Sequence, residues 1–554
     1  MQHKKSKGDR KATFLFVKRV IFEFMKYHIS LVLALVLAAP LNSYAQSDAP
    51  DEENAGLECT SIVVGRMASA DGSVITSHTC DGTSHTWIDI VPAADHKRSE
   101  TTAIRKNWRK TRFVTDTVGI KVVGEIPQVR HTYSYVNTGY PSLNEKQLGI
   151  GETTFTGPDT LINPDSPILI EELCRLALER CDNARDAVRT MGEIAEKYGY
   201  GDGGECLTVA DKNEVWQFEI TGCGKHEKGA IWAAQRIPDD HIGISANIPR
   251  IGRIDREDPD YFMASDNLED VAQKYGLWDG EGEFIFWKAI KCSYAGGKNF
   301  REREFFVFNE LAPSLGLSFD MDEIPFSVKP DEKVDVRKVM DLLRGTYEGT
   351  EFDMCRNWLV EVPAKDTVEA HKEISPIANP WLTTTARNTL NTIAPGTVEF
   401  HRTLAVAWCS YSTVIQLRNW LPDGVGGICW YAPDNPGQSP RIPVFCGGSQ
   451  LPGAFFTCGQ KVYDPDCVLW QFRKANRLAT LSWQTVKKGF LENTMKMEEI
   501  AFGGLKDLES AYMAAPRKDR AAILDAYTAS VHGQAVDCWK QMEEKYWLQF
   551  GRGF

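Results

Sequence analysis

The chain has 554 residues, of which 43% are hydrophobic and 25% are charged, and its formal net charge is −12 at pH 7. This composition is typical of a globular protein, and the length suffices for one large domain with insertions or for two or three domains. The acidic balance argues against nucleic acid or an anionic membrane as the main partner and leaves small neutral or cationic substrates open.

The amino-terminal part of the chain has the pattern of targeting and processing sequence. A basic stretch is followed by an apolar run at 30–39 and then by Ser43-Tyr44-Ala45, in which Ser43 and Ala45 are the small residues expected at a cleavage site. The apolar run is shorter than the roughly 20 residues of a membrane-spanning helix, which favours a cleaved signal peptide at 1–45. Residues 46–58 are acidic and poor in apolar side chains, as expected of a disordered propeptide. The mature protein is therefore expected to begin at Cys59 and to be secreted or periplasmic, with no membrane anchor after processing.

The first predicted structural unit is a β-hairpin directly after Cys59. Two β-rich runs, Thr60–Val64 and Ser73–Ser77, are joined through Asp71-Gly72, which is a strong turn signal. Such a hairpin brings the end of its second strand back beside Cys59. Helical spacing follows over 168–198, and the other strands expected in this half lie at 132–137, 148–155, 206–210, 215–220 and 241–246.

The second half of the chain is predicted to begin with helices and loops over 255–345 and a polar surface connection over 363–378. A second β-rich block is expected over 397–445, and almost continuous amphipathic helix over 469–547. We therefore expect a main domain with insertions at 59–468 and a helical carboxyl-terminal region at 469–554 that packs on it.

A metal site is one candidate chemistry near the hairpin. His78, Cys80, Asp81 and His85 are all residue types that bind zinc. Adjacent residues of a strand point to opposite faces, however, so Cys80 and Asp81 cannot converge on one ion. The sequence thus favours no metal.

Thiol chemistry accounts better for the position of Cys59. A free cysteine is only slightly ionised at neutral pH and needs a base. If the bond between Glu58 and Cys59 is cut, the new α-amine, with an ordinary pKa of about 7.7 to 8.0, can accept the thiol proton. The alternative is that Cys59 is a buried strand residue without a chemical role.

A family resemblance favours the chemical role. Cys59–Gly65, Ala68–Ser73 and Ser77–Gly82 resemble the amino-terminal signature of the dipeptidase A and secernin-like family of cysteine N-terminal-nucleophile hydrolases. Penicillin V acylases and bile salt hydrolases are more distantly similar. The resemblance continues in order through 144–154, 209–211, 236–240, 246–247, 347–350, 417–418 and 426–427.

The resemblance implies an α+β fold, a four-layered αββα sandwich, and amide hydrolysis without a metal or cofactor. Cys59 would attack the scissile carbonyl. Asp81 would hold its α-amine, and Asn247 would position the amine or stabilise the oxyanion. In plainer interpretations, Asp81 makes a turn with Gly82 and Asn247 caps a strand.

Two positions depart from the acylase pattern. His78 stands where the acylases place an arginine, and Thr154 stands where they place an oxyanion-hole asparagine. We expect His78, Glu152 and Thr154 to bind substrate, Glu152 because the ammonium of a short peptide needs a carboxylate partner. His78 could equally be a satisfied strand residue.

The expected function is that of a cysteine dipeptidase that cleaves short peptides with a free amino terminus through a thioester acyl-enzyme. Its partners would be small peptides and no nucleic acid, and a homo-oligomer is compatible with the sequence. Two alternatives stay open, an acylase or amidase acting on a non-peptide amide and a non-catalytic binding relative of the same fold. A metallopeptidase is a more distant third.

Overall fold

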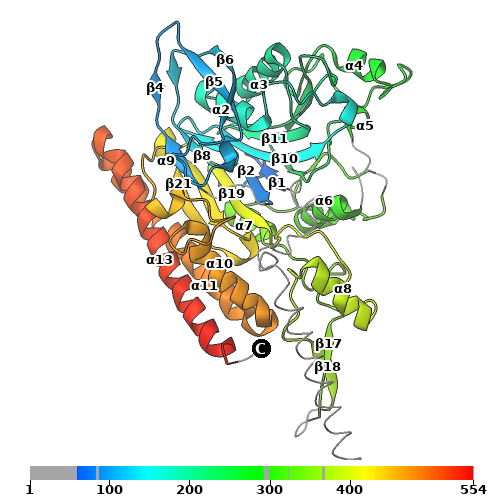
Figure 1. The fold of residues 1–554 in the computed structure, drawn as a ribbon, viewed down its shortest axis with the longest axis vertical. Helices are drawn as coiled ribbons and strands as arrows, with labels where there is room; N and C mark the ends of the chain where they lie inside the picture. The colour runs from blue at the N-terminus through cyan, green and yellow to red at the C-terminus, as the bar shows by residue number, and fades with distance from the viewer. Residues whose placement is uncertain (1–58, 83–86, 292–297, 322, 365–368, 553–554) are drawn as a thin grey trace, which may run out of the picture. The chain divides into compact units, whose positions relative to one another are not determined.

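The computed structural model describes residues 59–82, 87–291, 298–321, 323–364 and 369–552 (Figure 1). The predicted signal peptide and propeptide lie outside the described residues, as does His85. Within the described part, no helix is both long and apolar enough to cross a membrane. Every cysteine that the structure describes is free.

Two antiparallel sheets form the centre of the fold. Counted over the described residues, the first has seven strands in the order β16-β14-β1-β2-β19-β20-β21 and the second eight in the order β15-β13-β12-β11-β10-β9-β8-β3. The strands of the first sheet are β1 (Ser61–Val64), β2 (Val74–Asp81), β14 (Ile242–Ser245), β16 (Ser327–Val328), β19 (Cys409–Leu417), β20 (Gly427–Pro433) and β21 (Ile442–Phe445). Those of the second are β3 (Asp89–Val91), β8 (Tyr135–Asn137), β9 (Leu143–Asn144), β10 (Gly149–Thr156), β11 (Gly204–Ala210), β12 (Val215–Thr221), β13 (Ile231–Ile237) and β15 (Phe262–Ala264).

The two sheets pack face to face across a seam of small and polar side chains. The Thr208 hydroxyl lies 2.6 Å from that of Ser61 and 2.7 Å from that of Thr76, which joins β11 to β1 and β2. At Gly151 on β10, a Cβ would lie 2.1 Å from the carbonyl oxygen of Ser77 on β2. The sheets approach this closely only because residue 151 has no side chain.

Helices cover the outer faces of both sheets. Helices α2 (Ile170–Arg180) and α3 (Ala184–Tyr198) pack on the second sheet around buried side chains such as Trp216 and Phe218. The first sheet is covered by α6 (Lys298–Leu311), α7 (Val336–Leu343), α10 (Val468–Ala479), α11 (Trp483–Gly503), α12 (Leu505–Ala514) and α13 (Arg520–Phe550). The order of layers is therefore helix, sheet, sheet, helix (Figure 1).

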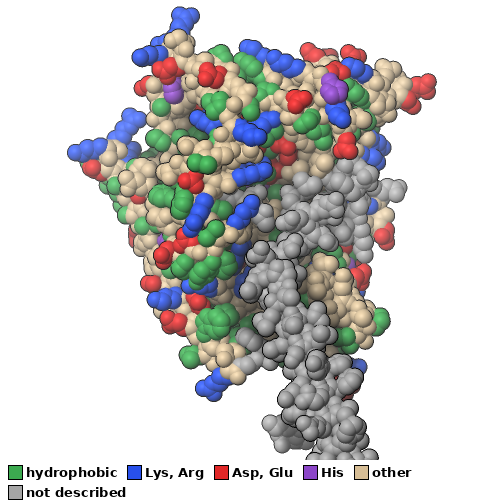
Figure 2. Space-filling view, viewed as in Figure 1, with side chains coloured by type: hydrophobic (Ala, Val, Ile, Leu, Met, Phe, Trp, Pro, Cys, Tyr) green, Lys and Arg blue, Asp and Glu red, His purple; other side chains and the backbone are tan. Residues whose placement is uncertain are grey.

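The remaining elements are short and lie outside the two main sheets. They are the two-stranded pairs β4 (Ala94–Asp95) with β7 (His131–Thr132), β5 (Thr101–Lys106) with β6 (Lys121–Pro127), and β17 (Leu359–Val362) with β18 (His371–Ile374), together with the helices α4 (Leu268–Lys274), α5 (Phe286–Ile290), α8 (Thr384–Ile393) and α9 (Asp423–Gly426). On the face that Figure 2 shows, positively and negatively charged side chains are interspersed, as is typical of a solvent-facing surface.

The predicted hairpin after Cys59 is confirmed, because Thr60 pairs with Thr79 and Val64 with Ile75. The continuous helical span over 168–198 is wrong. The chain breaks into α2 and α3 at 181–183, where the Asn183 side chain accepts the backbone N–H of Asp186 and starts the second helix.

Two other predicted spans also need correction. The connection over 363–378 contains β18, which pairs with β17. The strand expected over 132–137 is divided between β7, which pairs with β4, and β8, which belongs to the second sheet. At the coarser level, a mixed fold of antiparallel sheets and helices with a helical carboxyl-terminal region is observed as predicted.

Candidate active site

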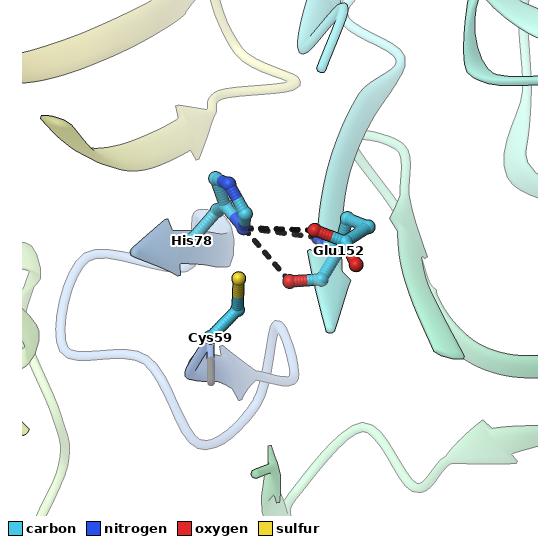
Figure 3. A group of neighbouring side chains, drawn as sticks. All are labelled: Cys59, His78 and Glu152. Carbon is cyan, nitrogen blue, oxygen red and sulfur yellow. Dashed lines mark hydrogen bonds and ion pairs between the residues drawn. The ribbon is translucent and has the colours of Figure 1, made fainter. Parts of the chain in front are cut away.

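Cys59 lies two residues before the start of β1, next to the carboxyl end of β2. Its side chain is buried at 4% exposure. Sγ of Cys59, a ring nitrogen of His78 and a carboxylate oxygen of Glu152 all lie within 4.8 Å of one another. Figure 3 shows these side chains converging, with His78 on β2 of the first sheet, Glu152 on β10 of the second and Cys59 in the segment that leads into β1. The predicted hairpin and the packing of the sheets therefore create the cluster together.

The Cys59 thiol is protonated unless a base is present. Burial raises its pKa well above the ordinary value, and the nearby Glu152, Cys80 and Asp81 raise it further. These effects disfavour the thiolate, the form that attacks a carbonyl carbon. A nucleophilic Cys59 consequently requires a proton acceptor.

Asp81 ends β2 and is held by a buried arginine. Its Oδ2 accepts a hydrogen bond from Nη2 of Arg402 at 2.5 Å and one from the Thr79 hydroxyl at 3.3 Å. Burial raises the pKa of Asp81, and the Arg402 guanidinium opposes that rise. Its other oxygen, Oδ1, is buried and accepts no hydrogen bond from the described residues. Asp81 therefore has one oxygen available to a further donor.

Asn247 follows β14 in a left-handed backbone conformation with φ of 63°. Asparagine tolerates this region better than most residues. Its Oδ1 accepts a hydrogen bond from Arg303 at 2.9 Å, and its Nδ2 donates to the carbonyl oxygen of Thr154 at 2.6 Å. These two contacts fix which side of the amide carries the donors.

His78 is a neutral, buried imidazole. Its Nδ1 lies 2.7 Å from the carbonyl oxygen of Glu152, which can only accept, so Nδ1 carries the proton. Burial lowers the pKa of His78 to about 4. It therefore supplies no positive charge at neutral pH and does not replace an arginine. Its Nε2 is buried and makes no hydrogen bond to any described residue.

Glu152 forms a buried carboxyl pair with Glu205, a residue that the sequence did not indicate, and Thr154 lies between the two carboxyls. The Thr154 hydroxyl lies 3.0 Å from Oε1 of Glu152 and 2.9 Å from Oε1 of Glu205. A hydroxyl has one proton for these two carboxyls, and a proton held by one carboxyl supplies the second hydrogen bond. Burial raises the pKa of both, and Glu152 raises that of Glu205 further. Thr154 thus bridges two carboxyls.

The structure also adds arginines that the sequence did not reveal. Arg303 on α6 donates to the carbonyl oxygen of Cys59 at 2.7 Å, and Arg402 pairs with Asp81. Arg109 lies 3.2 Å from Glu171 on α2 and 4.6 Å from the ring of Tyr140. The alternating Arg301-Glu302-Arg303-Glu304 was the one local signal, and it is also typical of an exposed helix.

A metal ion could be held by a set of ligands that differs from the predicted one. Cys59, His78 and Glu152 offer a thiolate, an imidazole and a carboxylate at close range. Of the four side chains considered from sequence, only His78 belongs to this set.

Comparisons with known proteins place the chain in a family. The model of peptidase family C69 matches residues 58–496. The chain belongs to peptidase family C69.

Curated relatives agree with this peptidase family. The C69 chain is 26% identical to a probable dipeptidase of Latilactobacillus sakei over 70% of its own length and 74% of the relative. It is 24% identical to a probable dipeptidase of Salmonella dublin, over 83% and 94% of the two chains. It is 23% identical to dipeptidase A of Lactobacillus helveticus, over 80% and 86%. All three relatives are named as dipeptidases, two of them as probable ones.

Proposed function

We propose that this C69 peptidase is a cysteine dipeptidase that uses Cys59 as an amino-terminal nucleophile. The observation that carries the proposal is the convergence of Cys59, Asp81 and Asn247. Two buried arginines hold these groups, and one oxygen of Asp81 accepts no hydrogen bond from the residues that the structure describes. That oxygen is suited to accept a hydrogen bond from an α-amine at residue 59, which would form when the bond to Glu58 is cut.

The proposed reaction begins with proton transfer from the Cys59 thiol to its own α-amine. Sγ attacks the carbonyl carbon of the peptide bond, and an amide N–H of Asn247 stabilises the oxyanion. The carbon–nitrogen bond then breaks, and the leaving amine takes the proton from the α-ammonium. Water attacks the thioester carbon, the carbon–sulfur bond breaks, and the thiol forms again. Asp81 holds the α-amine throughout.

Glu152, Thr154 and His78 are proposed to bind the substrate. An ionised Glu152 beside a protonated Glu205 gives the pair one negative charge, which matches the single positive charge of a peptide's amino terminus. Glu152 Oε2 and Glu205 Oε2 are both buried and accept no hydrogen bond within the described part of the chain. An ammonium has three N–H donors, so it could satisfy both oxygens.

The finer fold and the processing of the chain belong to the same proposal. The layer order and the position of Cys59 at the start of a strand support an N-terminal-nucleophile hydrolase fold. Export of the chain, removal of 1–45 and loss of 46–58 are proposed from the sequence. Small peptides are the proposed substrates.

The first experiment is to determine the amino terminus of active protein by intact mass and terminal sequencing. The proposal requires a chain that begins at Cys59 and hydrolysis that is lost on thiol alkylation. Active protein that begins at Gln46 and stays so would refute the mechanism.

A metal-dependent peptidase is the second candidate, because Cys59, His78 and Glu152 lie close enough to share an ion. A chelator separates the two proposals. Loss of turnover with a chelator and recovery with added Zn²⁺ would favour the metal-dependent reaction. Full activity in the chelator would favour the amino-terminal cysteine.

A further inference from the structure

Two consecutive residues of α6 contact opposite sides of the candidate active site. Glu302 and Arg303 are both fully buried, at 0% exposure. Burial of charged side chains is costly unless each is paired and hydrogen-bonded. Because neighbouring residues of a helix point in different directions, the two side chains can reach different partners.

Arg303 joins the start of β1 to the end of β14. Its Nη1 donates to the carbonyl oxygen of Cys59 at 2.7 Å and to the Thr60 hydroxyl at 2.9 Å. Its Nη2 donates to the carbonyl oxygen of Ala246 at 2.8 Å and to Oδ1 of Asn247 at 2.9 Å. Each terminal nitrogen has two N–H donors, so all of them are used. A planar guanidinium that makes these bonds fixes the position of Asn247 relative to Cys59.

Glu302 reaches Asp81 through one intermediate residue. Its carboxylate accepts the backbone N–H of Arg402 at 2.9 Å, and its other oxygen lies 2.8 Å from Nδ1 of His401. The guanidinium of Arg402 then pairs with Asp81 at 2.5 Å. The second side of the site is thus attached to the same turn of α6.

We propose that α6 is the positioning element of this active site. Arg303 sets the distance between the nucleophile and the oxyanion donor, and Glu302 sets the orientation of Asp81 through Arg402. Neither α6 residue touches the reacting atoms in this scheme. The inference rests on the proposed function, because it assigns Cys59 and Asn247 the roles given above.

A purely structural role is the competing explanation, and another buried arginine provides the matched control. Arg441 is also 0% exposed, and its Nη1 donates to the Ser412 hydroxyl at 3.1 Å and to the carbonyl oxygen of Trp430 at 3.3 Å. These partners belong to β19 and β20 and are not candidate site residues. A change at Arg441 therefore reports the general cost of altering a buried guanidinium.

The test compares Arg303→Lys with Arg441→Lys. Lysine keeps the charge but loses the planar fork, so both variants should unfold at a lower temperature. We expect kcat of the folded Arg303→Lys protein to fall by about 100-fold with KM little changed, the size expected for misplaced reacting groups. Arg441→Lys should keep its kcat. An Arg303→Lys kcat no lower than that of Arg441→Lys would overturn the proposal.

The rate of Cys59 alkylation by iodoacetamide, followed by peptide mass mapping, is a readout independent of peptide hydrolysis. We expect slower alkylation in Arg303→Lys at neutral pH, because a misaligned α-amine leaves less thiolate. If the wild-type protein cleaves no peptide, the proposed function fails. The difference in alkylation rate between Arg303→Lys and Arg441→Lys still tests whether Arg303 positions Cys59. Equal alkylation rates in the two variants would count against it.

A milder pair of variants covers the case in which Arg303→Lys does not fold. Thr60→Val removes one hydrogen bond of Arg303, and Ser412→Ala removes one hydrogen bond of Arg441. The proposal expects a lower kcat in Thr60→Val only. Equal kcat values in the two variants would overturn it.

Discussion

Asp81 and Asp434 are both buried against arginines, but they differ in how many of their carboxylate oxygens accept a hydrogen bond. Asp434 accepts from Nε of Arg473 at 2.6 Å on one oxygen and from Nδ2 of Asn476 at 2.9 Å on the other. Burial acts to raise its pKa, but Arg473 and Arg477 outweigh burial and the pKa is lowered. Of the two carboxylate oxygens of Asp81, Oδ1 has no hydrogen-bond donor among the described residues.

The comparison separates a charged cluster in which every carboxylate oxygen has a hydrogen-bond donor from one in which some oxygens have none. Every carboxylate oxygen of Asp434 has a donor, so its network needs nothing further. Around Cys59, by contrast, buried oxygens of Asp81, Glu152 and Glu205 and the Nε2 of His78 lack a partner among the described residues. Unsatisfied buried polar groups are rare because each is costly. Their concentration beside a cysteine is what indicates a ligand site.

The largest expected effect is that of Cys59→Ala. Removal of the nucleophile should lower kcat by on the order of 10⁶-fold, to below detection. The thermal midpoint should change little, because alanine fits the same buried site and Cys59 forms no disulfide. Initial rates on a panel of dipeptides, with calorimetry on the same sample, measure both. Hydrolysis by Cys59→Ala at a rate close to that of the wild-type protein would refute the cysteine mechanism.

The next effect tests the two aspartates directly. Asp81→Asn and Asp434→Asn each leave a buried arginine without its countercharge, and a loss of about 3 to 5 kcal/mol of stability is expected for such a change. Only Asp81→Asn should also lower kcat in the folded protein, by about 100-fold, because the α-amine loses its anchor. Unfolding by denaturant and kcat at a temperature well below both transitions provide the measurements. A kcat loss in Asp434→Asn of equal size would remove the distinction.

A smaller effect concerns the pH dependence of stability through Glu205. Its pKa is raised in the folded protein, so the folded state binds more protons than the unfolded state above the ordinary glutamate pKa of about 4.3. Stability should therefore fall as pH rises from that value through the raised pKa. Glu205→Gln keeps the neutral form and should remove this slope, which makes the variant the more stable of the two at alkaline pH. Denaturant unfolding across pH measures it, and parallel curves for the two proteins would contradict the shared proton.

The smallest effect concerns the seam itself. Gly151→Ala places a Cβ 2.1 Å from a backbone oxygen of the opposite sheet, and overpacking of this kind costs about 1 to 3 kcal/mol. Gly124→Ala on β6 is the control, because its Cβ would meet nothing within 4 Å. Equal thermal midpoints for the two variants would mean that the two sheets can move apart to accommodate the added Cβ without loss of stability.

The sequence predicted the parts of the site that depend on local pattern. The turn at Asp71-Gly72 and the strand periodicity around it predicted that the second strand returns beside Cys59, and the family resemblance supplied Asp81 and Asn247. Arg303, Arg402 and Glu205 were not foreseen, because their partners are set by the packing of α6 and the sheets. A charged helix segment that faces the interior has the same local pattern as one that faces water.

Arg303 lies 244 residues after Cys59, and Arg402 lies 321 residues after Asp81. Synthesis therefore imposes an order of events. A chain still on the ribosome can form the first hairpin long before either guanidinium exists to meet it. The arrangement proposed to hold and use the Cys59 amine is complete only once about three quarters of the polypeptide has been made, so the chain cannot use it during the earlier part of translation.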